Sequence, residues 1–166
     1  MALNAYLRIK GQKTGEVKGS VIQKGREGKI MVIAASHGID SPQDSRTGMP
    51  TGSRLHKPFI ITKESDKSSP VLYGMLASNE RIVEWDLQFW SPTLSSPSGT
   101  GQEIQTHSVK LMNASICSIN FCMPNNKNPD LVRYMEYEQV AFTYQKIIWT
   151  WNDGGITAAD DWSSPV

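Results

Sequence analysis

The sequence predicts a mainly β protein with one short helix, and three observations lead to this fold class. Apolar residues recur with a period of two in most apolar stretches of the 166-residue chain, which is the spacing of a strand with one buried face. One segment, residues 69–78, has helical spacing instead. Long polar stretches separate the apolar ones. With about six to eight strands and one helix, closure into a barrel or a pair of packed sheets is expected, because closure removes exposed strand edges.

Four candidate strands lie within residues 3–89. In residues 83–89 every second residue, starting from Val83, is apolar, and residues 3–10 alternate in the same way. Lys29–Ala35 is apolar almost throughout, and this predicts one strand covered on both faces. Phe59–Thr62 is a shorter candidate.

The helical segment lies between the candidate strands Phe59–Thr62 and residues 83–89. Ser69 is the expected N-cap and Pro70 the first helical residue, a position that tolerates proline. Leu72, Met75 and Leu76 are spaced to share one face. Asn79 is expected to end the helix in a left-handed conformation.

Longer strands are expected in the second half. Gln102–Leu111 and Ala114–Met123 predict either one long strand or two strands separated by a bend at Asn113. A further strand begins near Tyr137. Its apolar face comprises Val140, Phe142 and Tyr144, and beyond Lys146 the apolar set shifts to Ile147, Trp149 and Trp151. A β-bulge is expected there, since one extra residue exchanges the two faces of a strand.

Two polar segments connect these elements within what we expect to be a single domain, residues 1–166. Asp40–Lys57 is too long to be a simple turn, and loops of this length are often functional. Ser91–Gly101 is rich in Ser, Gly and Pro and predicts a flexible connector.

Composition argues against several classes of protein. The chain has 17 Lys and Arg against 16 Asp and Glu, so no overall field favours nucleic acid or anionic lipid. Cys117 and Cys122 are five residues apart in one expected strand, so they should point to opposite faces and stay reduced, as in cytoplasm. The N-terminus lacks the pattern of a secretory signal. No apolar stretch is long enough for a membrane-spanning helix.

The residues with chemical potential do not form a recognisable active site. His37, His56 and His107 have no metal-ligand spacing, and they are expected to be surface or hydrogen-bonded side chains. No G-x-S-x-G motif is present. Asp160 and Asp161 are expected to cap or to form ion pairs. The strand tryptophans are expected to pack in the core or an interface. We therefore predict no catalytic residues, no metal and no cofactor, and a protein that is not an enzyme.

Several segments, in the same order along nearly the whole chain, resemble the Hcp family, the haemolysin-coregulated proteins of type VI secretion. These are the opening AYLRIKGQKTGEVKG, the segment TGMPTGSRLHKPF with its R-x-H-K-P-F pattern, the helical KSSPVLYGMLASNE, the strand FTYQKIIWTW and the ADDW near the C-terminus. Each motif is weak alone, whereas the set in this order is specific. The connector after Trp90 is longer than is common in relatives.

The resemblance implies a β-barrel of two packed antiparallel sheets with one short flanking helix and a long extended loop. It also implies a homohexamer whose rings stack into a tube within a contractile sheath, capped by a VgrG spike, with effector proteins in the lumen. The protein would reside in the bacterial cytoplasm before firing and then be secreted without a signal peptide. It would bind no nucleic acid and insert into no membrane.

The resemblance also suggests where contacts lie. Ser36 corresponds to a position that faces the lumen in relatives. The extended loop should contact other subunits or rings through Asp44, Arg46, Arg54, His56 and Lys57, with its positive charges meeting carboxylates or carbonyls of a partner. Two alternatives stay open: a phage-type tail-tube protein and a monomeric ligand-binding β-barrel. The native mass separates a ring from a monomer.

Overall fold

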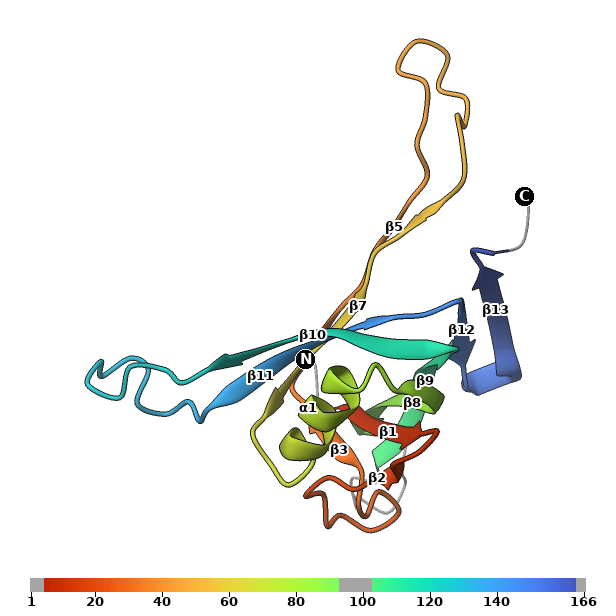
Figure 1. Ribbon diagram of the computed structural model, residues 1–166. Coiled ribbons are helices and arrows are strands. Elements are labelled where there is room, and N and C mark those ends of the chain that lie inside the picture. The colour runs from red at the N-terminus through yellow and green to blue at the C-terminus, as the bar shows by residue number, and fades with distance from the viewer. Residues whose placement is uncertain (1–4, 93–102, 164–166) are drawn as a thin grey trace.

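Two long arms project from a β-barrel in the computed structural model, which describes residues 5–92 and 103–163 (Figure 1). The elements in chain order are β1 Ala5–Gly11, β2 Gly15–Val17, β3 Ile30–Val32, β4 Ala34–Ser36, β5 Ile39–Asp40, β6 Leu55–His56, β7 Phe59–Glu64, α1 Ser69–Ala77, β8 Arg81–Pro92, β9 Glu103–Met112, β10 Ala114–Cys122, β11 Tyr137–Thr143, β12 Lys146–Trp151, the 3-10 turn η1 Asp153–Gly155 and β13 Ile156–Asp161. The described chain is therefore mainly β with one α-helix, as predicted.

The strands of the barrel form one 11-stranded antiparallel sheet, which curls into two faces that meet at a corner and are here called its two sheets. One sheet has the order β3, β1, β8, β9, β12, β13, and the other the order β10, β11, β7, β4. At the corner, the start of β10 pairs with the start of β8. The bend that separates β9 from β10 lies at Asn113, whose φ of 51° is left-handed, so the two-strand alternative is correct.

A filled core lies between the sheets. Side chains with less than 2% of their surface exposed include Leu7, Ile9, Ile30, Ile61, Ile82, Trp85, Leu87, Phe142 and Ile147. Trp85 packs edge-on against Phe59 and Phe142, at centroid distances of 5.0 and 5.4 Å. Because side chains fill the interior of the barrel, the structure does not favour the alternative of a monomeric barrel that binds a ligand in its own lumen.

The helix α1 closes one side of the barrel, with Leu72 and Met75 buried. It spans the predicted segment, and Asn79 has the predicted left-handed φ, 49°. The N-cap is Ser68 and not Ser69. Ser69 instead accepts a hydrogen bond from the backbone N–H of Asp66, at 3.1 Å.

Three strand predictions need correction. The apolar run Lys29–Ala35 is not one covered strand: it passes from β3 in one sheet to β4 in the other at Ile33, and residues 33–36 are exposed. Val83 is 55% exposed, because a register shift in the pairing of β1 with β8 leaves it bulged out between two paired residues. The face change before Lys146 is not a bulge within a strand but a break, after which β12 pairs with different neighbours from β11.

The first projection, here the polar arm (residues 37–57), is the predicted long loop. It is an open hairpin in which only β5 and β6 pair, with one further bridge between Gln43 and Pro50. In Figure 1 it rises from the barrel as an orange to yellow ribbon. Its length and exposure match the prediction that it extends away from the barrel.

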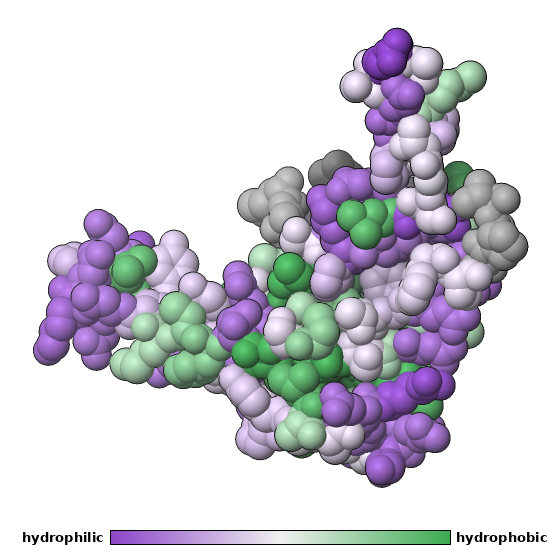
Figure 2. Space-filling model, turned by 45° about the horizontal axis from the view of Figure 1, so that its top comes forward, coloured by the Kyte–Doolittle hydropathy of each residue, from purple (hydrophilic) through white to green (hydrophobic). Residues whose placement is uncertain are grey.

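The second projection, here the apolar arm (residues 121–137), was not predicted. It continues β10 and β11 beyond the barrel, at the left of Figure 1. In Figure 2 apolar residues run from the barrel onto the root of this arm, and its tip is mostly polar.

Two further expectations concern absent features. Among the described residues no helix combines the length and apolarity needed to cross a bilayer. The predicted connector Ser91–Gly101 lies outside the described residues from residue 93 onward.

Candidate functional site

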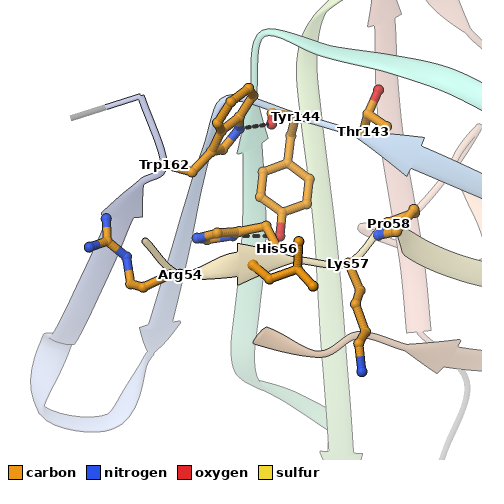
Figure 3. Close-up of a pocket in the computed structure, with 8 residues that line it drawn as sticks. Arg54, His56, Lys57, Pro58, Thr143, Tyr144 and Trp162 are labelled. Atoms are coloured by element: carbon orange, nitrogen blue, oxygen red, sulfur yellow. Dashed lines mark hydrogen bonds between the residues drawn. The ribbon is translucent and has the colours of Figure 1, made fainter. Parts of the chain in front are cut away.

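The root of the polar arm is fastened to the barrel by two histidines that converge on one tyrosine. His37 precedes β5 and His56 lies in β6, so each of the two chains of the arm contributes one imidazole. The hydroxyl of Tyr144 lies 2.5 Å from Nε2 of His37 and 3.0 Å from Nδ1 of His56. Figure 3 shows the hydroxyl of Tyr144 pointing at the imidazole of His56, with a dashed line for the hydrogen bond between them.

A carboxylate of the C-terminal strand completes the network. Oδ2 of Asp160 in β13 accepts a hydrogen bond from Nε of Arg54 at 2.7 Å and lies 2.9 Å from Nε2 of His56. The indole N–H of Trp162 donates to the carbonyl oxygen of Tyr144, which holds the end of β13 against the strand break. We call His37, Arg54, His56, Tyr144 and Asp160 the arm clamp.

One assignment satisfies the donors and acceptors of the arm clamp with both imidazoles neutral. Since Asp160 accepts, Nε2 of His56 carries the proton and its Nδ1 accepts from the hydroxyl of Tyr144. The oxygen of Tyr144 then accepts from Nε2–H of His37. This assignment of tautomers follows from the hydrogen-bond network.

The pKa of Tyr144 suits a residue that holds the arm in place and does not suit a catalytic nucleophile. Burial, together with the charge of Asp160, raises the pKa of Tyr144 to about 12. A hydroxyl, an imidazole and a carboxylate in a row could suggest a catalytic triad, but a nucleophile needs an activated hydroxyl. This hydroxyl stays protonated.

Asp160 and His37 also have shifted pKa values, and near neutral pH one of them is charged and the other is not. Burial works to raise the pKa of Asp160, but hydrogen bonds from Arg54 and His56 outweigh it and lower the pKa below the ordinary value. Burial, and then the nearby His56, lower the pKa of His37 below its ordinary 6.5. Near neutral pH Asp160 is therefore charged and His37 is neutral.

A small pocket of about 240 Å³ opens between the arm root and the C-terminal end of the chain (Figure 3). Its lining comprises Arg54, Leu55, His56, Lys57, Pro58, Thr143, Tyr144 and Trp162. Leu55 and Trp162 are both more than half exposed. The pocket is thus half open and largely apolar above the polar network.

The structure separates the predicted loop residues into a root group and a tip group. Arg54 and His56 belong to the arm clamp, and Lys57 forms an exposed ion pair with Asp40 at 2.8 Å. Asp44 and Arg46 lie at the tip, where Oδ1 of Asp44 accepts from the backbone N–H of Arg46 at 2.7 Å.

This separation corrects the expected charge of the arm. Arg54 and Lys57 were expected to offer positive charge to a partner, yet both are paired within the chain. Of the predicted cations only Arg46 has no ion-pair partner within the part of the chain that the structure describes. A partner would therefore meet fewer free charges than the sequence suggests.

Ser36 lies in β4, where it is exposed and opposite Ile60 of β7. Its exposure is compatible with a position lining a channel, and the lumen assignment stays a prediction. The other histidine, His107, lies outside the arm clamp and stacks between Phe89 and Trp151, at centroid distances of 4.1 and 5.7 Å.

The sequence did not predict that His37, Tyr144, Asp160 and Trp162 meet at the root of the polar arm. The last three lie in the motifs YQKIIW and ADDW, so their identity was visible, but nothing in the sequence brought them next to R-x-H-K-P-F. Asp160 did form the ion pair that was expected of it.

The apolar arm is a second candidate contact surface. Its exposed apolar side chains are Phe121, Met123, Leu131, Val132, Tyr134 and Met135. Asn125 and Asn128 organise the tip, since their side-chain oxygens accept from the backbone N–H groups of Lys127 and Asp130, each at 3.0 Å. The overlooked signal was this run of turn-forming residues followed by apolar ones. An ordered arm that exposes so much apolar surface is typical of an interface.

Comparison with known proteins identifies similar sequences over nearly the full length. The profile of the family described as "Type VI secretion system effector, Hcp" matches residues 6–151. The "Major exported protein" of Pseudomonas aeruginosa is 37% identical over 175 aligned residues, which cover 100% of this chain and 99% of that protein.

Solved structures give the same result for the fold. A structure described as "Crystal structure of Hcp protein" superposes with a TM-score of 0.87 at 27% identity, covering 98% of this chain and 99% of that one. The Hcp1 protein of the E. coli EAEC 042 pathovar gives a TM-score of 0.82 at 35% identity, with 97% and 99% covered. The secreted protein Hcp3 of P. aeruginosa gives 0.76 at 29% identity, with the same coverage.

Proposed function

The chain belongs to the Hcp family and is a tube subunit of the type VI secretion system, and we propose that six copies close into a ring and that the rings stack through the polar arm. The observation that carries this proposal is the pair of arms. They leave the barrel in different directions (Figure 1) and differ in chemistry. A tube needs two different contacts, one that closes a ring and one that joins rings.

The apolar arm suits the contact within the ring. Its exposed apolar side chains have no core of their own, and burying one large apolar side chain contributes about 1.5 to 3 kcal/mol. A head-to-tail contact, in which the arm of one subunit lies on the barrel of the next, closes a ring if its rotation divides the circle.

The polar arm suits the contact between rings. Its tip carries the turn of Asp44 and Arg46 and one exposed apolar residue, Met49. Exposed ion pairs contribute about 0 to 1 kcal/mol each. The contact should therefore be weak and sensitive to salt.

Further partners follow from the family. We propose that the tube docks on a VgrG spike, is surrounded by sheath proteins and carries effector proteins in its lumen, with Ser36 lining that lumen. The subunit would wait in the bacterial cytoplasm and leave the cell on sheath contraction. Its role would be structural and not enzymatic, as the family resemblance implies.

Native mass tests the ring. Six chains of 18.5 kDa give about 110 kDa, and light scattering at micromolar concentration measures it. Val132→Asp in the apolar arm should dissociate the ring, because a carboxylate would be buried without a partner. Val83→Asp is the matched control, since Val83 is exposed to a similar extent, 55% against 61%, and lies on the barrel. A wild-type monomer under these conditions would contradict the proposal.

A further inference from the structure

The polar arm has little internal structure to fix its direction. Its two chains pair only at Ile39 with His56 and at Asp40 with Leu55, apart from the single bridge near the tip. An isolated two-stranded ribbon is marginally stable in water. Something outside the arm must therefore hold it in place.

We propose that Tyr144 and Asp160 act as positioning residues for the polar arm, and that the arm clamp holds the arm at neutral pH and releases it in acid. This inference concerns the subunit itself. Its consequence for assembly rests on the proposed role of the polar arm in stacking.

Both positioning residues are themselves held firmly. Tyr144 is 6% exposed and is part of the barrel core. Asp160 lies in β13, which pairs with β12 over six residue pairs. Trp162 ties the two together, since its indole donates to the carbonyl of Tyr144 and its backbone N–H donates to that of Gln145 at 3.2 Å.

The two segments of the polar arm, one leaving the barrel and one returning to it, are attached to the barrel separately. The leaving chain is attached through His37, which bonds to Tyr144 and stacks on Phe59 at a centroid distance of 5.2 Å. The returning chain is attached through Arg54 and His56, which both bond to Asp160. Because the two attachments share Tyr144 through His56, they fix the root of the hairpin at several points.

Acid acts on this arrangement through His37. Its pKa is lowered in the folded chain by burial and by the nearby His56. Folding therefore favours the neutral form, and the contribution of His37 is present above its unfolded pKa near 6.5 and is lost as the pH falls through the folded value. Protonation takes place at Nδ1 and leaves the bond from Nε2–H to Tyr144 possible, but it puts a positive charge in a half-buried position beside a second imidazole, and that charge disfavours the docked position of His37.

Other charged groups at the root come from every element packed against it. They are Asp40 and Lys57 on the arm, Arg54 and His56 in β6 and next to it, Lys146 in β12, and Asp160 and Asp161 in β13. Asp160 is already occupied by Arg54 and His56, and Asp40 is paired with Lys57. A proton taken up by His37 therefore finds no free carboxylate to pair with, and Asp160, whose pKa is lowered, stays charged at pH 5.

Spin-label distances measure the direction of the arm directly. Labels at Arg46→Cys on the tip and Val83→Cys on the barrel, in a Cys117→Ser, Cys122→Ser background of the full chain, report arm position. Labelled subunits are diluted with unlabelled ones so that each ring holds one pair. The measurements are made at about pH 8 and pH 5, on either side of the ordinary histidine pKa.

The expected result for the wild-type clamp is one narrow distance at pH 8, which is lost into a broad distribution at pH 5. His37→Gln keeps a donor toward Tyr144 but takes up no proton, so its distance should stay narrow at both pH values. His107→Gln is the matched control and should behave as wild type, since the pKa of His107 is also lowered by burial but the residue lies outside the clamp. Asp160→Asn should be broad already at pH 8.

The proposal is overturned if the wild-type distance is equally narrow at both pH values, or if His37→Gln broadens as wild type does. A narrow distance for Asp160→Asn at pH 8 would remove Asp160 as a positioning residue. None of these measurements needs stacked tubes. Tube length by electron microscopy is scored separately, so a failure of the stacking role and a failure of the clamp give different results.

Discussion

Lys63 of β7 and Glu138 of β11 are directly opposite each other in the sheet and form an ion pair of 3.2 Å, with both side chains buried. Nζ of Lys63 also contacts Oδ1 of Asp66 at 3.1 Å and Oγ of Ser69 at 3.0 Å, beneath the start of α1. Lys63→Met would leave two carboxylates without their cation, and we expect a loss of about 3 to 5 kcal/mol in the free energy of unfolding. Urea unfolding at fixed protein concentration measures it.

The exposed pair of Arg8 and Glu84, 3.1 Å apart, supplies the control. Arg8→Met should cost about 0 to 1 kcal/mol, because solvent screens an exposed pair. An equal loss of unfolding free energy in Lys63→Met and Arg8→Met would show that burial of the Lys63 cation has no special role.

Gly19 is expected to tolerate no side chain. A Cβ at this position would lie 2.3 Å from the carbonyl oxygen of Lys29, and that backbone has little room to move because Gly19 N–H donates to Gly28 at 2.8 Å. Gly19→Ala should destabilise the protein by about 1 to 3 kcal/mol. Gly74→Ala in α1 meets nothing within 4 Å and should stabilise by about 0.5 to 1 kcal/mol. Thermal unfolding of both variants tests the contrast, and a neutral Gly19→Ala would contradict it.

Glu80 should contribute a pH-dependent part of the stability. Its carboxylate accepts from the hydroxyl and the N–H of Thr14 at 2.6 and 2.7 Å, and from the N–H of Lys13 at 2.6 Å. These bonds, those of Thr14 first, lower the pKa of Glu80 below its ordinary 4.5. Its contribution is therefore present above the unfolded pKa and is lost as the pH falls through the lower folded value.

Glu80→Gln should accordingly lower the free energy of unfolding by about 1 to 3 kcal/mol near neutral pH. The difference from wild type should shrink when both are unfolded in urea below the folded pKa. A difference that stays constant with pH would mean that the charge of Glu80 is not involved.

The polar arm should be dispensable for folding but not for assembly. Deleting residues 43–52 removes the tip with Asp44 and Arg46 and leaves the arm clamp in place. We expect a folded barrel that makes shorter tubes and is secreted poorly. Tubes of normal length at both low and high salt, seen by electron microscopy, would show that the arm does not join rings.

Ser36→Gln should leave the ring intact and change how much cargo it retains. The side chain is exposed on β4, so a longer one meets no core residue there. Native mass and the amount of effector that copurifies are the two measurements. Loss of the ring would place Ser36 in a subunit interface instead of the lumen.

The sequence predicts the alternating strands well because one buried face leaves a clear period. Leu7, Ile9, Trp85 and Leu87 are all buried as expected. Val83 differs because a bulge in β8 depends on its pairing with β1, which the sequence of one strand does not encode. The apolar run around Ile33 was predicted to be covered on both faces. Residues 33–35 are instead exposed in the single subunit, because a local apolar pattern does not show whether the covering surface belongs to the same chain.

The candidate site was predicted in part for a related reason. Arg54 and His56 were singled out, but their partner Asp160 is more than 100 residues away along the chain. A contact of this separation arises from the topology, in which β12 and β13 return to the root of the polar arm. The sequence predicts the strands on either side of the apolar arm but not that they leave the barrel, since a period of two is the same inside and outside a barrel.

Because β10 and β11 extend from the core to the start of the apolar arm, with one register shift between Ile116 and Ser118, the arm is mechanically part of the barrel. Seven residue pairs join the two strands, and β11 is joined to β7 by six more. The hydrogen bonds of an antiparallel ladder run across the strands, so a pull along the arm loads them in shear and all must share it. In the ring proposed above, force on the apolar arm would therefore pass into the barrel through backbone ladders, and the side-chain contacts would need only to keep the subunits in register.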